Sequence, residues 1–86
     1  MSEARRFTDD EGVLWRAFAE AVPGGDYKGR YQLVLKPDSG EGEPLTLPEI
    51  RWNSLDTAKR TIRTMSDVEL RRRLRSAVNR RAMTLV

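Results

Sequence analysis

Apolar residues recur at helical spacing along the last third of the chain. Across residues 65–82, at about 100° of rotation per residue, one narrow apolar stripe is formed by Leu70, Leu74, Ala77 and Val78. Ser66 and Glu69 have the spacing of a capping box, in which each side chain satisfies a backbone N–H group of the first helical turn. The pattern predicts an amphipathic helix that begins at this cap and turns Leu70 and Leu74 towards a core.

The pattern changes from alternating to helical after Trp52. At helical spacing, one side of this segment carries Leu55, Ala58, Ile62 and Met65. Ser54 or Asn53 can act as the N-cap, because a short polar side chain there accepts a hydrogen bond from the first turn. Residues 53–82 are therefore expected to form two consecutive helices.

Residues 31–36 alternate between two sides of an expected strand. Tyr31, Leu33 and Leu35 point one way, and Gln32, Val34 and Lys36 point the other. One face of this strand is therefore expected in the core. A second, short strand is predicted at residues 44–47. Because Pro48 has no N–H group, this strand is expected to lie at a sheet edge or to end there. The glycine-rich and polar segments 23–30 and 37–43 are predicted loops.

Residues 13–21 suit two alternatives. In the first, Phe7 and residues 13–15 lie on strands joined by a turn in which Gly12 supplies a positive φ angle. In the second, Thr8 and Glu11 form a capping box, and a helix ends before the Pro-Gly-Gly sequence at residues 23–25. We favour the hairpin, and we expect the polar residues 1–6 to fray.

These patterns predict one small α+β domain over residues 1–86. A β-rich part, residues 7–50, would form an antiparallel sheet of three to four strands, and two consecutive C-terminal helices would cover it. Hydrophobic residues make up 38% of the chain and charged residues 34%. Trp15 and Trp52 are among the large apolar side chains expected to anchor the core.

Three short motifs resemble those of small bacterial domains of unknown function. They are Phe7-Thr8-Asp9-x-x-Gly12-x-x-Trp15, Gly29-Arg30-Tyr31-x-Leu33-Val34-Leu35 and Met65-Ser66-Asp67-x-Glu69-Leu70-x-x-x-Leu74. Such domains open with a β-hairpin and finish with a short helix, so the resemblance implies the hairpin alternative. It implies no catalytic or binding residues.

The residue types for common catalytic and metal chemistry are missing. The chain has no histidine and no cysteine, which are frequent general bases, nucleophiles and zinc ligands. The acidic sets Asp9-Asp10-Glu11 and Glu41-x-Glu43 fall in predicted turns, where such residues usually serve turn geometry. We therefore expect no enzyme, no metal and no cofactor. No segment has the length of a membrane span or the pattern of a signal peptide, so a cytoplasmic location is expected.

Charge is divided unevenly along the chain. Residues 1–50 hold six basic and ten acidic residues, a balance of −4, whereas residues 51–86 hold ten and three, a balance of +7. Thirteen of the sixteen basic residues are arginine. The candidate binding residues are Arg71, Arg72, Arg75, Arg80, Lys59, Arg60 and Arg63.

Two functions suit this charge pattern. The arginine-rich C-terminal helix can present guanidinium groups to the acidic surface of a protein partner, as in an interaction or adaptor module. Alternatively, the same helices can contact the phosphates of a nucleic acid. The simplest interpretation of the same arginines is that they form a solvated helix surface with no partner. We favour the protein partner, because the acidic first half would repel a long polyanion.

Overall fold

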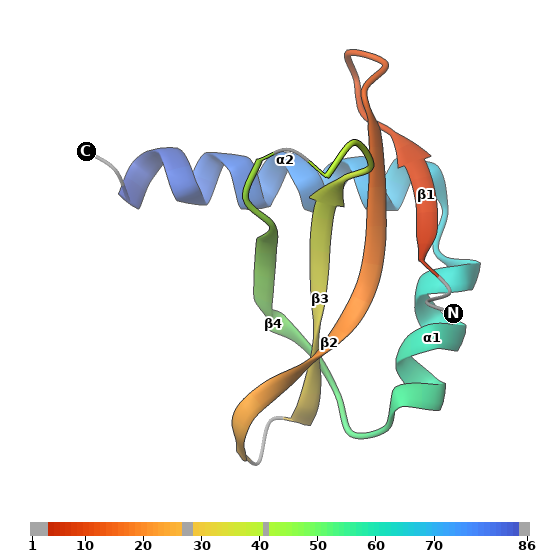
Figure 1. Cartoon of the computed structure of the whole chain (residues 1–86), viewed down its shortest axis with the longest axis vertical. Coiled ribbons are helices and arrows are strands. Elements are labelled where there is room, and N and C mark those ends of the chain that lie inside the picture. Colours follow the sequence, from red (N-terminus) through yellow and green to blue (C-terminus); the bar gives the residue numbers. More distant parts are fainter. Residues whose placement is uncertain (1–3, 27–28, 41, 85–86) are drawn as a thin grey trace.

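The computed structural model describes residues 4–26, 29–40 and 42–84 and confirms the predicted small α+β fold (Figure 1). Its elements, in chain order, are β1 (Arg5–Thr8), β2 (Leu14–Asp26), β3 (Gly29–Pro37), β4 (Leu45–Trp52), α1 (Leu55–Thr64) and α2 (Asp67–Thr84). Among these described residues, no helix is long and apolar enough to cross a membrane.

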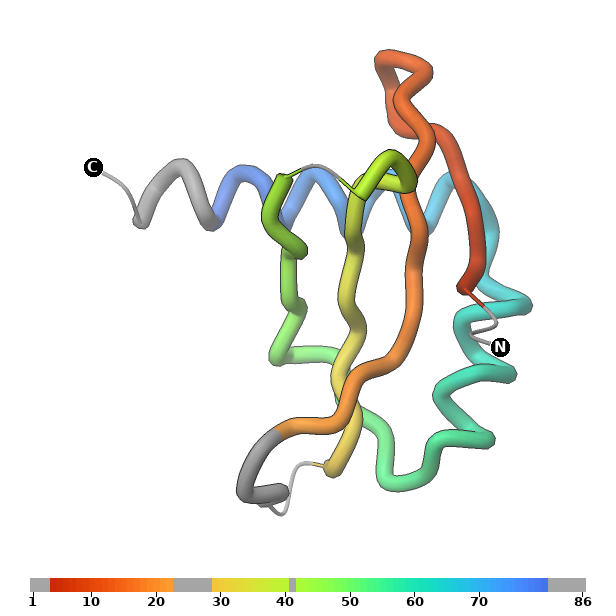
Figure 2. Tube along the Cα trace, viewed as in Figure 1, coloured from red at the N-terminus to blue at the C-terminus, as the bar shows by residue number. Residues whose placement is uncertain are grey.

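The four strands form one antiparallel sheet in the order β1-β2-β3-β4. In Figures 1 and 2, α2 passes behind one end of the sheet. Helix α1 lies beside the N-terminal end of α2, on the β1 side of the sheet. Because α2 packs against both outer strands, it spans the full width of the sheet. The two helices follow each other directly in the chain, as predicted.

Residues 14–21 are strand, as the favoured alternative predicted, and Val13 lies directly before this strand. Phe7 of β1 pairs with Trp15 of β2, and Gly12 adopts the positive φ angle (83°) that the connecting turn requires. Asp9 organises this turn: its Oδ1 atom accepts hydrogen bonds from the backbone N–H groups of Glu11 (2.8 Å) and Val13 (2.9 Å). The Trp15 indole N–H donates to Asp9 Oδ2 at 2.9 Å. The Asp-x-x-Gly-x-x-Trp motif therefore encodes a turn and the orientation of one indole.

The structure corrects two predicted boundaries. The segment 23–30 was predicted to be a loop, but β2 continues to Asp26 and β3 begins at Gly29. A register irregularity between Ala21 and Asp26 accommodates the proline and glycines. Gly29 is required here, because a Cβ atom would lie 2.9 Å from the carbonyl oxygen of Trp52. At the N-terminus, β1 already begins at Arg5, so the last two residues of the predicted frayed tail, residues 1–6, pair with β2; residues 1–3 lie outside the described part.

The core lies between one face of the sheet and the two helices. Strand residues buried in it are Phe7, Ala17, Leu33, Leu35, Leu45 and Leu47. The helices contribute Ile62, Leu70, Leu74 and Ala77. Trp15 and Trp52 are half-buried and pack against this cluster. On the opposite face of the sheet, Val34 is buried as well, although the alternation pointed it towards solvent.

Two residues of the predicted apolar stripes face solvent instead. Leu55 is 37% exposed and Val78 is 46% exposed. Leu55 is the first residue of α1, one turn before Ala58, the first residue of this helix that is buried. In α2, the buried position is already filled by Ala77, and the next residue is turned away by about 100°.

Both helices begin at their predicted caps. The Ser54 hydroxyl accepts a hydrogen bond from the Thr57 N–H group at 3.2 Å, and the Ser66 hydroxyl accepts one from the Glu69 N–H group at 3.1 Å. The Glu69 carboxylate lies beside arginines of its own helix, at 3.2 Å from Arg73 Nη2. Only the serine half of the predicted capping box is thus present among the described contacts.

Strand β4 is an edge strand, as Pro48 indicated. It does not end there, because Leu47 pairs with Leu33 and Arg51 pairs with Gln32, which leaves residues 48–50 as a bulge in the edge. The Arg51 side chain holds the bulge closed: its Nε atom donates to the Pro48 carbonyl at 2.8 Å, and Nη1 donates to the Gly29 carbonyl at 3.2 Å.

Leu74 tests the packing of α2 on the sheet. Its side chain is 4% exposed, so the substitution Leu74→Ala is expected to reduce the free energy of unfolding by about 2–5 kcal/mol, as cavity-forming substitutions do. Val68→Ala, at a residue of the same helix that is 61% exposed, is the control and should change it by less than about 0.5 kcal/mol. Urea unfolding measures both. Equal stability of the two variants would mean that α2 does not depend on this contact.

Candidate functional site: the charged surfaces of the two helices

Arg71, on α2, is fixed to strand β1. Its Nε atom donates to the Thr8 carbonyl at 2.7 Å, and Nη2 donates to the Thr8 hydroxyl at 3.2 Å. The Thr8 carbonyl ends a short strand at the sheet edge, where a carbonyl group otherwise needs water. This guanidinium group therefore joins α2 to β1.

Arg75 and Arg80, further along α2, meet carboxylates from the first half of the chain. Arg75 Nη1 lies 2.8 Å from Asp10 Oδ2 in the turn between β1 and β2. Arg80 makes two hydrogen bonds of 2.8 Å to the two carboxylate oxygens of Glu49, in the bulge of β4. A hydrogen bond from the Arg80 side chain is the main reason that the pKa of Glu49 lies below its usual value. These pairs connect α2 to both outer parts of the sheet.

The remaining described arginines of α2 lie near a carboxylate of their own helix. Arg73 and Arg72 lie 3.2 Å and 3.8 Å from the Glu69 carboxylate. Arg5 of β1 forms an ion pair with Asp67 at the start of α2. The four predicted binding residues of α2 are thus all within reach of a partner in the same chain, and the most exposed of their ion-paired side chains is that of Arg72, at 69%.

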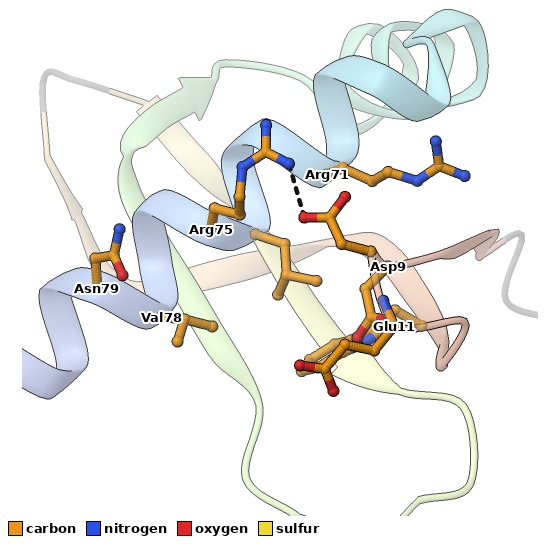
Figure 3. A pocket seen from close by; sticks show the side chains of 9 residues that line it. Asp9, Glu11, Arg71, Arg75, Val78 and Asn79 are labelled. Atoms are coloured by element: carbon orange, nitrogen blue, oxygen red, sulfur yellow. Dashed lines mark hydrogen bonds and ion pairs between the residues drawn. The ribbon is translucent and has the colours of Figure 1, made fainter.

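A hollow of about 240 Å³ lies between the β1–β2 turn and α2 (Figure 3). The turn contributes Asp9, Asp10 and Glu11, and β2 contributes Trp15; α2 contributes Arg71, Leu74, Arg75, Val78 and Asn79. Burial raises the pKa of Asp9, but the hydrogen bonds from Val13, Trp15, Glu11 and Gly12 outweigh this effect and lower it overall. Asp9 is therefore a carboxylate at neutral pH, and its oxygens are occupied within the turn.

The basic residues of α1 have a different environment. Lys59, Arg60 and Arg63 are exposed and, with Asp56, line a hollow of about 350 Å³. Within the part of the chain that the structure describes, none of these three cations has a carboxylate at ion-pair distance. Like charges three and four residues apart on a helix repel each other. Binding of an anion would therefore relieve a repulsion between cations of α1 that, unlike the paired arginines of α2, have no ion-pair partner among the described residues.

The structure divides the seven predicted binding residues into two groups. Those on α1 lie together at one surface, whereas those on α2 are spread along the helix and engage Thr8, Asp10, Glu49 and Glu69. None of these four partners was predicted from the sequence. The opposite charge balances of the two halves of the chain were the available signal, since +7 and −4 can neutralise each other within one fold.

Comparisons with protein-family models, with curated proteins and with solved structures found no match to this chain. The resemblance of its motifs to small bacterial domains therefore stays a prediction.

The Glu49–Arg80 pair predicts a pH dependence of stability. Because the folded state lowers the pKa of Glu49 from its usual 4.5, the pair stabilises the fold above that pH and loses this effect as the pH falls through the lowered value. We expect Arg80→Gln to raise the Glu49 pKa towards 4.5 and to flatten the loss of stability below it. Side-chain carboxyl NMR titration and thermal unfolding across this range check both.

Arg72→Gln is the matched control for this titration, because it removes an exposed arginine of the same helix that pairs with Glu69. It should leave the Glu49 pKa unchanged. An unchanged Glu49 pKa in Arg80→Gln would contradict the assigned cause.

Proposed function

We propose that this chain is a protein-interaction module that binds an acidic segment of a partner through Lys59, Arg60 and Arg63 on α1. The observation that carries this proposal is the contrast between the two helices. The cations of α1 have no carboxylate at ion-pair distance in the described chain, whereas Arg72, Arg75 and Arg80 of α2 each have one. The proposal keeps the class of function that the sequence favoured and moves the surface from α2 to α1.

The dimensions of the α1 surface suit a short acidic segment. Residues 59 and 63 are one helical turn apart, about 6 Å along the axis. The guanidinium groups of Arg60 and Arg63 can each bind a carboxylate with two parallel hydrogen bonds, and Lys59 adds a compact positive charge. A few successive carboxylates of a peptide cover such a distance.

Nucleic-acid binding is the second candidate, and the number of cations on the α1 surface argues against it. Three phosphate contacts give a log–log salt slope of about −2.7, whereas proteins that bind duplex DNA firmly make about six to ten such contacts. The engaged arginines of α2 would have to leave their partners to increase this number. We therefore expect weak binding to nucleic acid that disappears near physiological salt.

A charge-neutralising variant tests the proposal. Fluorescence anisotropy with a labelled hexaglutamate peptide compares the wild type with Lys59→Gln/Arg60→Gln/Arg63→Gln. If each exposed contact contributes about 0.2–1 kcal/mol, the variant should bind roughly threefold to a hundredfold more weakly. Its unfolding temperature should stay unchanged or rise slightly, because a repulsion is removed.

The matched control is Arg30→Gln/Lys36→Gln/Arg72→Gln, which removes the same charge from residues outside α1. It should bind hexaglutamate nearly as well as the wild type. An equal loss of affinity in both variants would mean that the peptide responds to the overall positive charge of the chain and not to the α1 surface. Submicromolar binding of a duplex oligonucleotide at about 0.15 M salt would favour the nucleic-acid alternative instead.

A further inference from the structure

The hollow between the β1–β2 turn and α2 differs from the α1 surface, because its lining suits a positively charged ligand. Its exposed lining is mainly apolar, and the apolar side chains that form it are Trp15, Leu74 and Val78. Leu74 is buried, whereas Val78 is 46% exposed. The Trp15 indole is fixed at one edge by its hydrogen bond to Asp9, so one aromatic side chain is held in a defined orientation at the hollow.

The two arginines at this hollow already have partners within the chain. Arg71 donates to Thr8, and Arg75 pairs with Asp10. In Figure 3, the Arg71 guanidinium group extends away from Val78 and Asn79, whereas the Glu11 carboxylate points towards the side where Val78 lies. The Glu11 side chain has no hydrogen-bond or ion-pair partner among the described residues.

The charges of the lining favour a cation. Three carboxylates, from Asp9, Asp10 and Glu11, face two guanidinium groups, which leaves a net charge of −1. Asp9 keeps its negative charge because the hydrogen bonds within the turn lower its pKa overall. An aromatic face beside a carboxylate attracts a cation through both the ring quadrupole and the charge.

We propose that this hollow binds an organic cation with an apolar body, which lies against Trp15, Leu74 and Val78 and directs its charged end to Glu11. The volume of about 240 Å³ is below the roughly 300–1,000 Å³ of drug-sized sites, so it holds one ring or one long side chain. A free aromatic amine and the basic side chain of a polypeptide share this chemistry. The inference is independent of the α1 proposal, because it uses another surface and the opposite charge.

An NMR titration of the full chain tests this site. Phenethylamine, the positively charged probe, should shift the Trp15 indole N–H and the Leu74 and Val78 methyl signals in a saturable way. The Trp52 indole should not move, and it serves as the internal reference. Phenylacetate, with a negative charge on a similar body, should bind at least twofold more weakly. No saturable shift, or equal shifts with phenylacetate, would overturn the proposal.

Two variants locate the ligand. Glu11→Gln should weaken phenethylamine binding about twofold to fivefold, the range of one exposed charge pair, whereas Glu20→Gln, on the opposite face of the sheet, should not change it. Val78→Lys places a cation at the exposed end of the hollow and should abolish binding. Unchanged affinity in both Glu11→Gln and Val78→Lys would overturn the assignment.

A second probe distinguishes the two sources of the cation. N-acetyl-arginine methylamide presents a basic side chain as a polypeptide does. Tighter binding of this probe than of phenethylamine would identify a peptide side chain as the ligand, and the reverse order would identify a free aromatic amine. Either order supports the site, and binding of neither probe contradicts it.

Discussion

The packing of one narrow apolar stripe of α2 on the sheet is the constraint on which the rest of the structure depends. Leu70, Leu74 and Ala77 are buried against Phe7, Leu35 and their neighbours. A four-stranded sheet with one apolar face needs such a cover, because an exposed apolar face costs roughly 25 cal/mol per Å². The stripe is only about one residue wide on each turn of the helix. The other described side chains of α2 are mostly polar, and the apolar Val68 and Val78 are exposed.

This arrangement decides where the charges meet. With its apolar stripe on the sheet, α2 presents its flanking arginines to the turn after β1 and to the bulge of β4. The carboxylates at these two places are Asp10 and Glu49. The excess of positive charge in the last third of the sequence is thus partly neutralised by the acidic first half. Each pair is exposed and contributes modestly, and together they connect α2 to both outer parts of the sheet.

Local signals predicted much of this fold. Ser66 was a predicted cap and Ser54 was one of two candidate caps, and both accept the expected hydrogen bonds, because capping depends on neighbours within four residues. The alternation at Leu33 and Leu35 was sufficient to predict a strand with a core face. Residues 23–26 and 29–30 were mispredicted as loop, because glycine and proline usually mark loops, and the close approach of Gly29 to Trp52 could not be known before the sheet was formed; residues 27–28 lie outside the described part.

The candidate site could be predicted only in part. The sequence identified all seven basic residues, but it could not separate the α1 group from the α2 group. That separation depends on contacts such as Arg71 with Thr8 and Arg80 with Glu49, which join residues 63 and 31 positions apart. The hollow beside Trp15 could not be predicted from the sequence either, since its lining comes from a turn, a strand and a helix that is distant in the sequence.

The claim that α2 is neutralised from within the chain is tested most directly by reversing one pair. Asp10→Arg and Arg75→Asp should each lower the free energy of unfolding, and the double variant should recover most of the loss. Urea unfolding gives the coupling energy when the wild type, the two single variants and the double variant are compared. This energy should be about 0.2–1 kcal/mol, the range for an exposed pair. Strictly additive effects, with no recovery in the double variant, would contradict the account.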